Sequence, residues 1–101
     1  MGQNNHHILE INFQIYLPFS KSLKDKRSVL KSLIQRFQNK FQLSISETGN
    51  NEKLQLGNLT IVIVNSDIKF LDNIRQKIEN FLFEEMFGKG EIINFSYNFI
   101  K

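Results

Sequence analysis

The chain contains no cysteine, no tryptophan and a single proline among its 101 residues. Without cysteine there is no disulfide, no thiolate nucleophile and no cysteine-ligated metal, a composition that suits a reducing compartment. We therefore expect a cytoplasmic protein. The longest largely apolar run, residues 59–64, is too short to cross a bilayer, and the polar first seven residues do not resemble a signal peptide. We expect no membrane partner.

Low-complexity and proline-rich segments are also missing, which disfavours long disordered regions. The length and the 41% hydrophobic fraction are those of one globular domain. We expect a flexible N-terminal tail over residues 1–7 and a single domain over residues 8–101. His6 and His7 fall in this tail, and we interpret the adjacent histidines as incidental rather than as metal ligands.

Four segments alternate apolar and polar residues, which is the period of a half-buried strand: residues 8–17, 41–46, 57–65 and 93–99. Two others carry an apolar stripe at helical spacing, up to about residues 40 and 87. Ser22, with Asp25 three residues later, resembles a capping box that begins the first helix, and Asp67 is suited to cap the second. The last strand should place Ile93, Phe95, Tyr97 and Phe99 on one side.

The resulting order, β-α-β-β-α-β, predicts an α+β fold: a ferredoxin-like βαββαβ sandwich with a four-stranded antiparallel sheet and two helices on one face. Tyr16 is the one aromatic residue expected on the open face of the sheet, which disfavours RNA recognition by stacking on that face. We interpret the ten phenylalanines mainly as packing residues. A polar open face of this kind can pair with a second copy, so a homodimer through the open sheet face is a further hypothesis.

The first helix carries an unusual charge distribution. Residues 21–40 hold seven basic side chains and one acidic side chain, whereas residues 67–86 hold three basic and five acidic ones. Cations are disfavoured in the first turn of a helix, and such violations are enriched at functional sites. We expect Lys24, Arg27 and Lys31 to face solvent, and Lys26 to extend past the helix start. Free backbone N–H groups there, together with Lys21 and Ser22, would suit a phosphate or carboxylate.

Three interpretations of this basic segment remain open. The first is a solvated helix face without further role, the second is a contact surface for RNA phosphates, and the third is a site for a small anion. The corresponding functions are an RNA-binding or ribosome-associated accessory protein and, as the alternative, a homodimeric regulatory module that binds a small anion without nucleic acid.

We find no catalytic constellation, no metal site and no cofactor motif. A secondary polar site formed by Ser46, Glu47 and Asp67 is the remaining possibility. An enzyme would require Glu47 and Asp67 to converge with Lys26, so we expect that the chain is not an enzyme.

The stretch from Leu17 to Leu30, with the hexamer SLKDKR, resembles the bacterial YlxP-like family, catalogued as domain of unknown function 503. The resemblance continues through residues 41–47 and 61–67 and covers most of residues 8–85. Leu54 departs from it, since the family carries a tryptophan there. The resemblance implies a ferredoxin-like fold and no established activity. Its genes tend to lie beside those of translation and ribosome-maturation factors, which implies RNA or ribosome association.

Overall fold

The computed structural model describes residues 6–49 and 52–100, and its elements follow the predicted order. The strands are β1 (His7–Tyr16), β2 (Ser44–Glu47), β3 (Leu56–Asn65) and β4 (Glu91–Ile100), and the helices are α1 (Leu23–Lys40) and α2 (Ile68–Met86). His7 pairs with Asn65 in the sheet, so β1 begins inside the predicted N-terminal tail. The rest of that tail, residues 1–5, and residue 101 lie outside the described residues.

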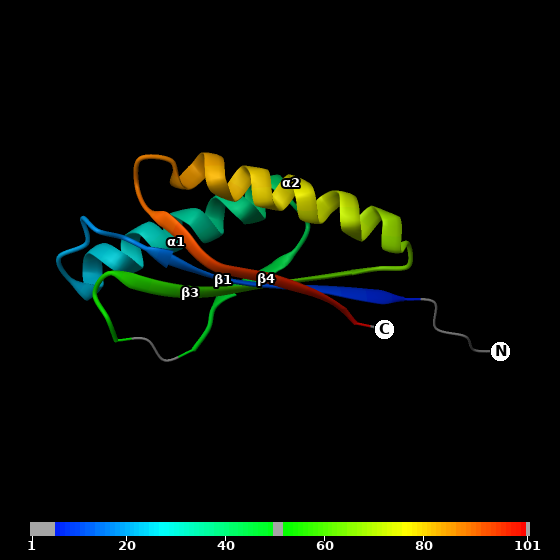
Figure 1. Cartoon of the computed structure of the whole chain (residues 1–101), viewed down its shortest axis with the longest axis horizontal. Coiled ribbons are helices and arrows are strands. Elements are labelled where there is room, and N and C mark those ends of the chain that lie inside the picture. The colour runs from blue at the N-terminus through cyan, green and yellow to red at the C-terminus, as the bar shows by residue number, and fades with distance from the viewer. Residues whose placement is uncertain (1–5, 50–51, 101) are drawn as a thin grey trace.

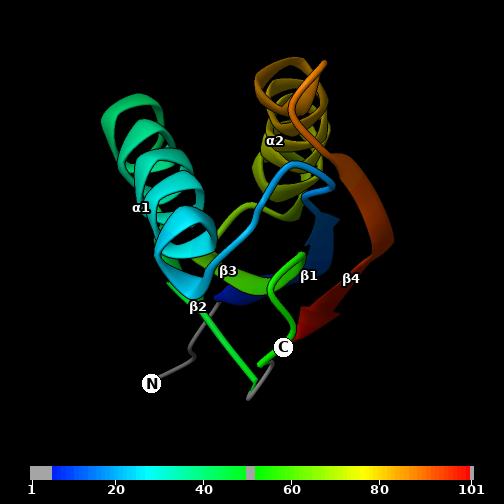
Figure 2. The same cartoon turned by 90° about the vertical axis from the view of Figure 1, so that its left-hand side faces the viewer.

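One antiparallel sheet contains the strands in the order β2-β3-β1-β4. Both helices cover the same face, with α1 above β2 and β3 and α2 above β1 and β4, and the other face is open (Figures 1 and 2). This order and this layering confirm the predicted ferredoxin-like βαββαβ sandwich. Neither helix, within the part of the chain that is described, is long and apolar enough to cross a membrane.

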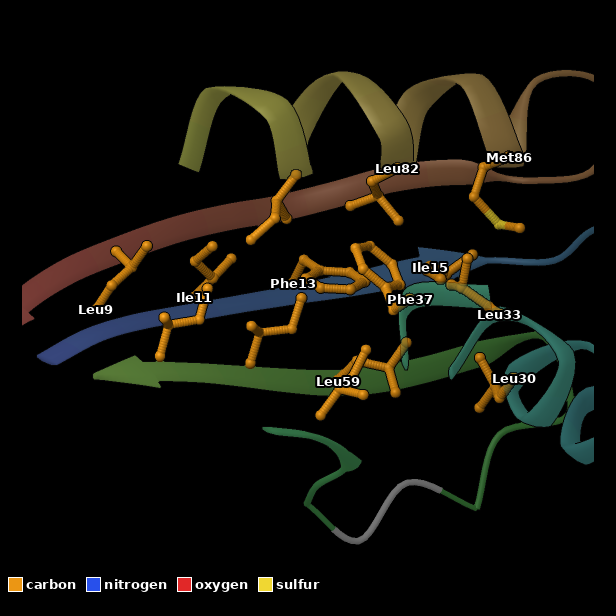
Figure 3. Close-up of a cluster of buried hydrophobic side chains, with 14 of the residues drawn as sticks. Leu9, Ile11, Phe13, Ile15, Leu30, Leu33, Phe37, Leu59, Leu82 and Met86 are labelled. Atoms are coloured by element: carbon orange, nitrogen blue, oxygen red, sulfur yellow. The ribbon is translucent and has the colours of Figure 1, made fainter. Parts of the chain in front are cut away.

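The core lies between the sheet and the helices. Alternate residues of β1 point into it, and Leu9, Ile11, Phe13 and Ile15 are at most 2% exposed. They meet one apolar stripe from each helix (Figure 3). The stripes contain Leu30, Leu33 and Phe37 of α1, and Leu71, Ile78, Leu82 and Met86 of α2. The period of two along the strand and of 3.6 along the helices explains why these residues share one interior.

The phenylalanines are less buried than predicted. Half of the ten are more than a third exposed: Phe19, Phe70, Phe83, Phe87 and Phe99. Phe70 is 46% exposed because it lies about 100° around α2 from the fully buried Leu71. The prediction that most of the phenylalanines face the core therefore holds for only about half of them.

A β-bulge in β4 changes which side chains face the helices. The pairing with β1 shifts between Asn12 and Gln14, where Asn94 has a φ of 53° in the left-handed region. Tyr97 and Phe99 pair with the core residues Ile11 and Leu9 and so lie on the helix side as predicted, whereas Ile93, before the bulge, pairs with Gln14. Ile93 therefore faces the open side, which corrects its predicted position.

Candidate functional site

The start of α1 is fixed by a reciprocal cap. The backbone N–H of Asp25 donates to Ser22 Oγ over 3.0 Å, and the Asp25 carboxylate accepts from the backbone N–H of Lys21, also over 3.0 Å. This arrangement confirms Ser22 as the N-cap and satisfies two backbone donors. It also places an acidic group at the helix start, so the free N–H groups expected there for an external anion are partly used within the chain.

Lys26 does not reach solvent, which corrects its predicted position. Its side chain is 2% exposed, and Nζ donates to the carbonyl oxygen of Lys53 over 2.7 Å and to that of Leu56 over 3.0 Å. A buried ammonium group is tolerated where hydrogen-bond acceptors replace water, and these carbonyls provide them. Lys26 therefore joins α1 to the segment that leads into β3, and it is not placed to contact an external ligand.

Lys24, Arg27 and Lys31 are exposed, as predicted. Their spacing of three and four residues places them on one flank of α1. The opposite flank faces α2, where Arg36 Nη1 lies 2.8 Å from Glu85 Oε1. By contrast, the side chains of Lys21, Lys24, Arg27 and Lys31 form no ion pair within residues 6–49 and 52–100. We call the surface formed by Lys24, Arg27 and Lys31 the basic flank.

A pocket of about 870 Å³ adjoins Lys21 at one end of the open sheet face. Tyr16, Leu56 and Ile93 contribute strand residues to it, and the remaining lining comes from two loops: Ser20, Lys21, Lys53, Leu54 and Gln55. The loops are joined to each other, because Leu17 N–H donates to Gln55 O over 2.8 Å and Gln55 Nε2 donates to Pro18 O over 3.2 Å. The lining of the pocket therefore combines apolar side chains with one tyrosine and two lysines.

Sequence reasoning did not find this pocket. Tyr16 was identified as the aromatic residue of the open face, but its neighbours Leu54 and Ile93 are distant in the sequence. Ile93 reaches the open face only because of the bulge at Asn94. No local pattern around Leu54 or Ile93 indicates that they meet.

The secondary site predicted from Ser46, Glu47 and Asp67 is not assembled. Glu47 pairs with Leu59 near the middle of β3, whereas Asp67 follows the end of that strand at Asn65. Six residues of strand separate these positions by about 20 Å. Asp67 instead caps α2, because its carboxylate accepts from the backbone N–H of Lys69 over 2.9 Å.

Lys26 lies still further from Asp67, because it contacts Leu56 at the beginning of β3. The constellation of Glu47, Asp67 and Lys26 that an enzyme would have required is therefore absent from the structure. The described residues contain no group of three or more histidine, cysteine, aspartate or glutamate side chains that could hold a metal ion.

The fold and the site together define a small α+β protein with a ferredoxin-like sheet, a basic helix flank and an adjoining pocket. The chain belongs to the family described as "Protein of unknown function (DUF503)", whose sequence model matches residues 8–97. This confirms the resemblance found in the sequence. The "Uncharacterized protein YlxP" of Bacillus subtilis (strain 168) is 49% identical over 45 residues. That match spans 45% of this chain and about half, 49%, of the relative's length.

Solved structures resemble the chain in fold alone. The de novo designed protein Foldit4 has a TM-score of 0.57 at 8% identity, with 95% of this chain and 97% of that chain covered. MupZ from Pseudomonas fluorescens has a TM-score of 0.55 at 17% identity, with coverages of 96% and 70%. SnoaB from Streptomyces nogalater, a cofactor-independent oxygenase, has a TM-score of 0.51 at 12% identity, with coverages of 94% and 91%. At such identities these likenesses carry no function across.

Proposed function

We propose that this protein is an RNA-binding or ribosome-associated accessory module that contacts backbone phosphates through the start of α1. The observation that carries the proposal is the basic flank, where Lys24, Arg27 and Lys31 share one side of the helix without an ion pair among the described residues. Phosphate contacts by lysine and arginine supply most of the affinity of sequence-independent nucleic-acid binding. Lys21 extends this surface to the pocket, whereas Lys26 acts within the fold.

The pocket supports single-stranded RNA over a duplex. Its volume of about 870 Å³ is within the range of small-ligand sites. Tyr16 alone does not form a sheet surface on which several bases stack, but it is 39% exposed and offers one ring for a single base inside the pocket. Lys21 lines the same pocket, so a nucleotide with its base against Tyr16 would have a cation near its phosphate. A double helix cannot insert a base in this way unless it is first unpaired.

Fluorescence anisotropy with a labelled single-stranded RNA at low salt tests the proposal. The test variant is Lys24→Ala/Lys31→Ala, and the matched control is Lys69→Ala/Lys77→Ala, which removes two exposed lysines from α2. Both variants change the net charge equally. We expect the test variant to weaken binding by roughly tenfold or more, since a hydrogen bond to a charged group contributes about 1.5–3 kcal/mol. We expect little change in the control.

If the two variants lost the same amount of RNA affinity, the loss would be explained by the lower net charge alone. That result would contradict a binding site on α1. The alternative function, a regulatory module that binds a small anion, is supported by the volume of the pocket, which lies within the range of small-ligand sites. It predicts that RNA does not bind measurably, while a mononucleotide or another phosphorylated small molecule binds and loses affinity in a Lys21→Ala variant.

A further inference from the structure

The outer edge of β4 lacks most of the features that normally keep a strand edge from pairing with another chain. β4 is an edge strand of ten residues, whereas β2, at the other edge, has four. Residues 92–100 contain no lysine, no other charged residue and no proline. Short length, charged side chains and proline are the usual means of blocking an exposed edge. A β-bulge is another means of blocking an edge, and β4 has one at Asn94. Its pairing with β1 is nevertheless regular from Ser96 to Ile100.

Apolar side chains of this regular part remain partly uncovered. Tyr97 is 42% exposed and Phe99 is 39% exposed, although both lie on the helix side of the sheet next to core residues of β1. Their rings contact each other edge to face with centroids 5.8 Å apart. Ile100 is also 43% exposed. An uncovered edge that carries aromatic side chains is suited to strand addition by a partner.

We propose that β4 pairs antiparallel with β4 of a second copy of this chain, with Tyr97 opposite Tyr97 of that copy. The residues around this position, Phe95-Ser96-Tyr97-Asn98-Phe99, read as aromatic, polar, aromatic, polar, aromatic in both directions. A two-fold antiparallel pair reads the second strand backwards. This register therefore places aromatic residues opposite aromatic residues on the helix side, and Ser96 opposite Asn98 on the open side. Cross-strand aromatic pairs of this kind stabilise a sheet.

The charges near this edge are compatible with self-association. Arg75 of α2 lies over the Tyr97 ring, 4.5 Å from its centroid, and would approach its own copy across the two-fold axis. Each Arg75 is already paired with Asp72 and Glu79, both at 3.2 Å. Because these carboxylates offset the charge of each arginine, the two Arg75 side chains would repel each other only weakly across the axis. The pairing uses neither the basic flank nor the pocket, so it holds or fails independently of RNA binding.

Sedimentation of the full chain at roughly 100 μM, where an association of micromolar strength is nearly saturated, tests the proposal. We expect twice the monomer mass of 11.9 kDa. The test variant is Ser96→Lys/Asn98→Lys. In the proposed register residue 96 of each copy lies opposite residue 98 of the other, so this variant creates two pairs of facing lysines and should weaken the dimer by roughly tenfold or more. The control is Ser44→Lys/Ser46→Lys, which adds the same charges on the same open face at the β2 edge and should remain dimeric.

A monomeric wild-type chain would overturn the proposal, as would a dimer that survives the test variant. Loss of the dimer in both variants would also overturn it, because that result indicates association through the open sheet face.

Cysteine cross-linking supplies a second measurement. Because the chain has no native cysteine, an introduced cysteine can form a disulfide only with the same cysteine of another copy. Residues directly opposite in an antiparallel pair have Cα atoms about 4.5–5.5 Å apart, which a disulfide can span. Oxidised Tyr97→Cys should therefore form a covalent dimer. Ser96→Cys should not, because its own copies would lie diagonally, about 7–8 Å or more apart. Equal cross-linking of both variants, or of neither, would contradict the register.

Discussion

Lys26 Nζ donates a hydrogen bond to the carbonyl oxygen of Leu56 over 3.0 Å, and so joins the first turns of α1 to the first residue of β3. A second bond, over 2.7 Å, reaches the carbonyl oxygen of Lys53 in the loop before that strand. A cation within the basic segment of the sequence thus stabilises the fold, while its neighbours Lys24 and Arg27 face solvent. The two roles can be separated by mutation.

Lys26→Ala should lower the free energy of unfolding by about 2–4 kcal/mol, because it removes two hydrogen bonds donated by a charged group at a position that is 2% exposed. Urea denaturation measures this change. Lys24→Ala, two residues away and exposed, is the control, and we expect it to alter stability by no more than about 0.5 kcal/mol. If the two variants were equally stable, the structural role of Lys26 would be refuted.

Gly57→Ala should destabilise the protein by about 1–3 kcal/mol through overpacking. A Cβ atom at this position would lie 2.8 Å from Leu30 Cδ1, and Leu30 is 1% exposed, so it has little room to move. Thermal or urea unfolding measures the change. Gly57→Ala should reduce the free energy of unfolding by clearly less in a Leu30→Ala background, because that background lacks the Leu30 atoms with which the new Cβ clashes. Additive effects of the two substitutions would argue against this contact.

Asn94→Ala should cost about 1–2 kcal/mol of stability, because Asn94 has a φ of 53° that a Cβ-bearing residue without a local polar group adopts poorly. Its amide also donates to Gln14 Oε1 on the open face. Asn94→Gly should be less costly than Asn94→Ala, since glycine adopts positive φ without strain. If alanine were tolerated as well as glycine, the bulge would not depend on the left-handed conformation.

The order of the elements and most of the core were predictable from the sequence because both depend on local periods. Leu9, Ile11, Phe13 and Ile15 alternate with polar residues, and that alternation alone places them on one face of a strand. Ser22 and Asp25 likewise form a cap through contacts within four residues of each other.

Other features depended on contacts that no local pattern encodes. The acceptors of Lys26 lie 27 and 30 residues away, so its burial could not be inferred from its position on α1. The side on which Ile93 lies follows from a single bulged residue, Asn94, which reverses the alternation before it. The pocket beside Lys21 exists because two loops and this altered strand meet. The exposed flank formed by Lys24, Arg27 and Lys31 was predictable, since helical spacing alone decides it.

The salt dependence of RNA binding tests the central claim, that exposed cations at the start of α1 contact backbone phosphates. If Lys21, Lys24, Arg27 and Lys31 each neutralise one phosphate of a single strand, log affinity should fall against log salt concentration with a slope of about −3. The Lys24→Ala/Lys31→Ala variant should lower the magnitude of that slope by about 1 to 2. An affinity that does not change with salt, or an unchanged slope in the variant, would contradict the account.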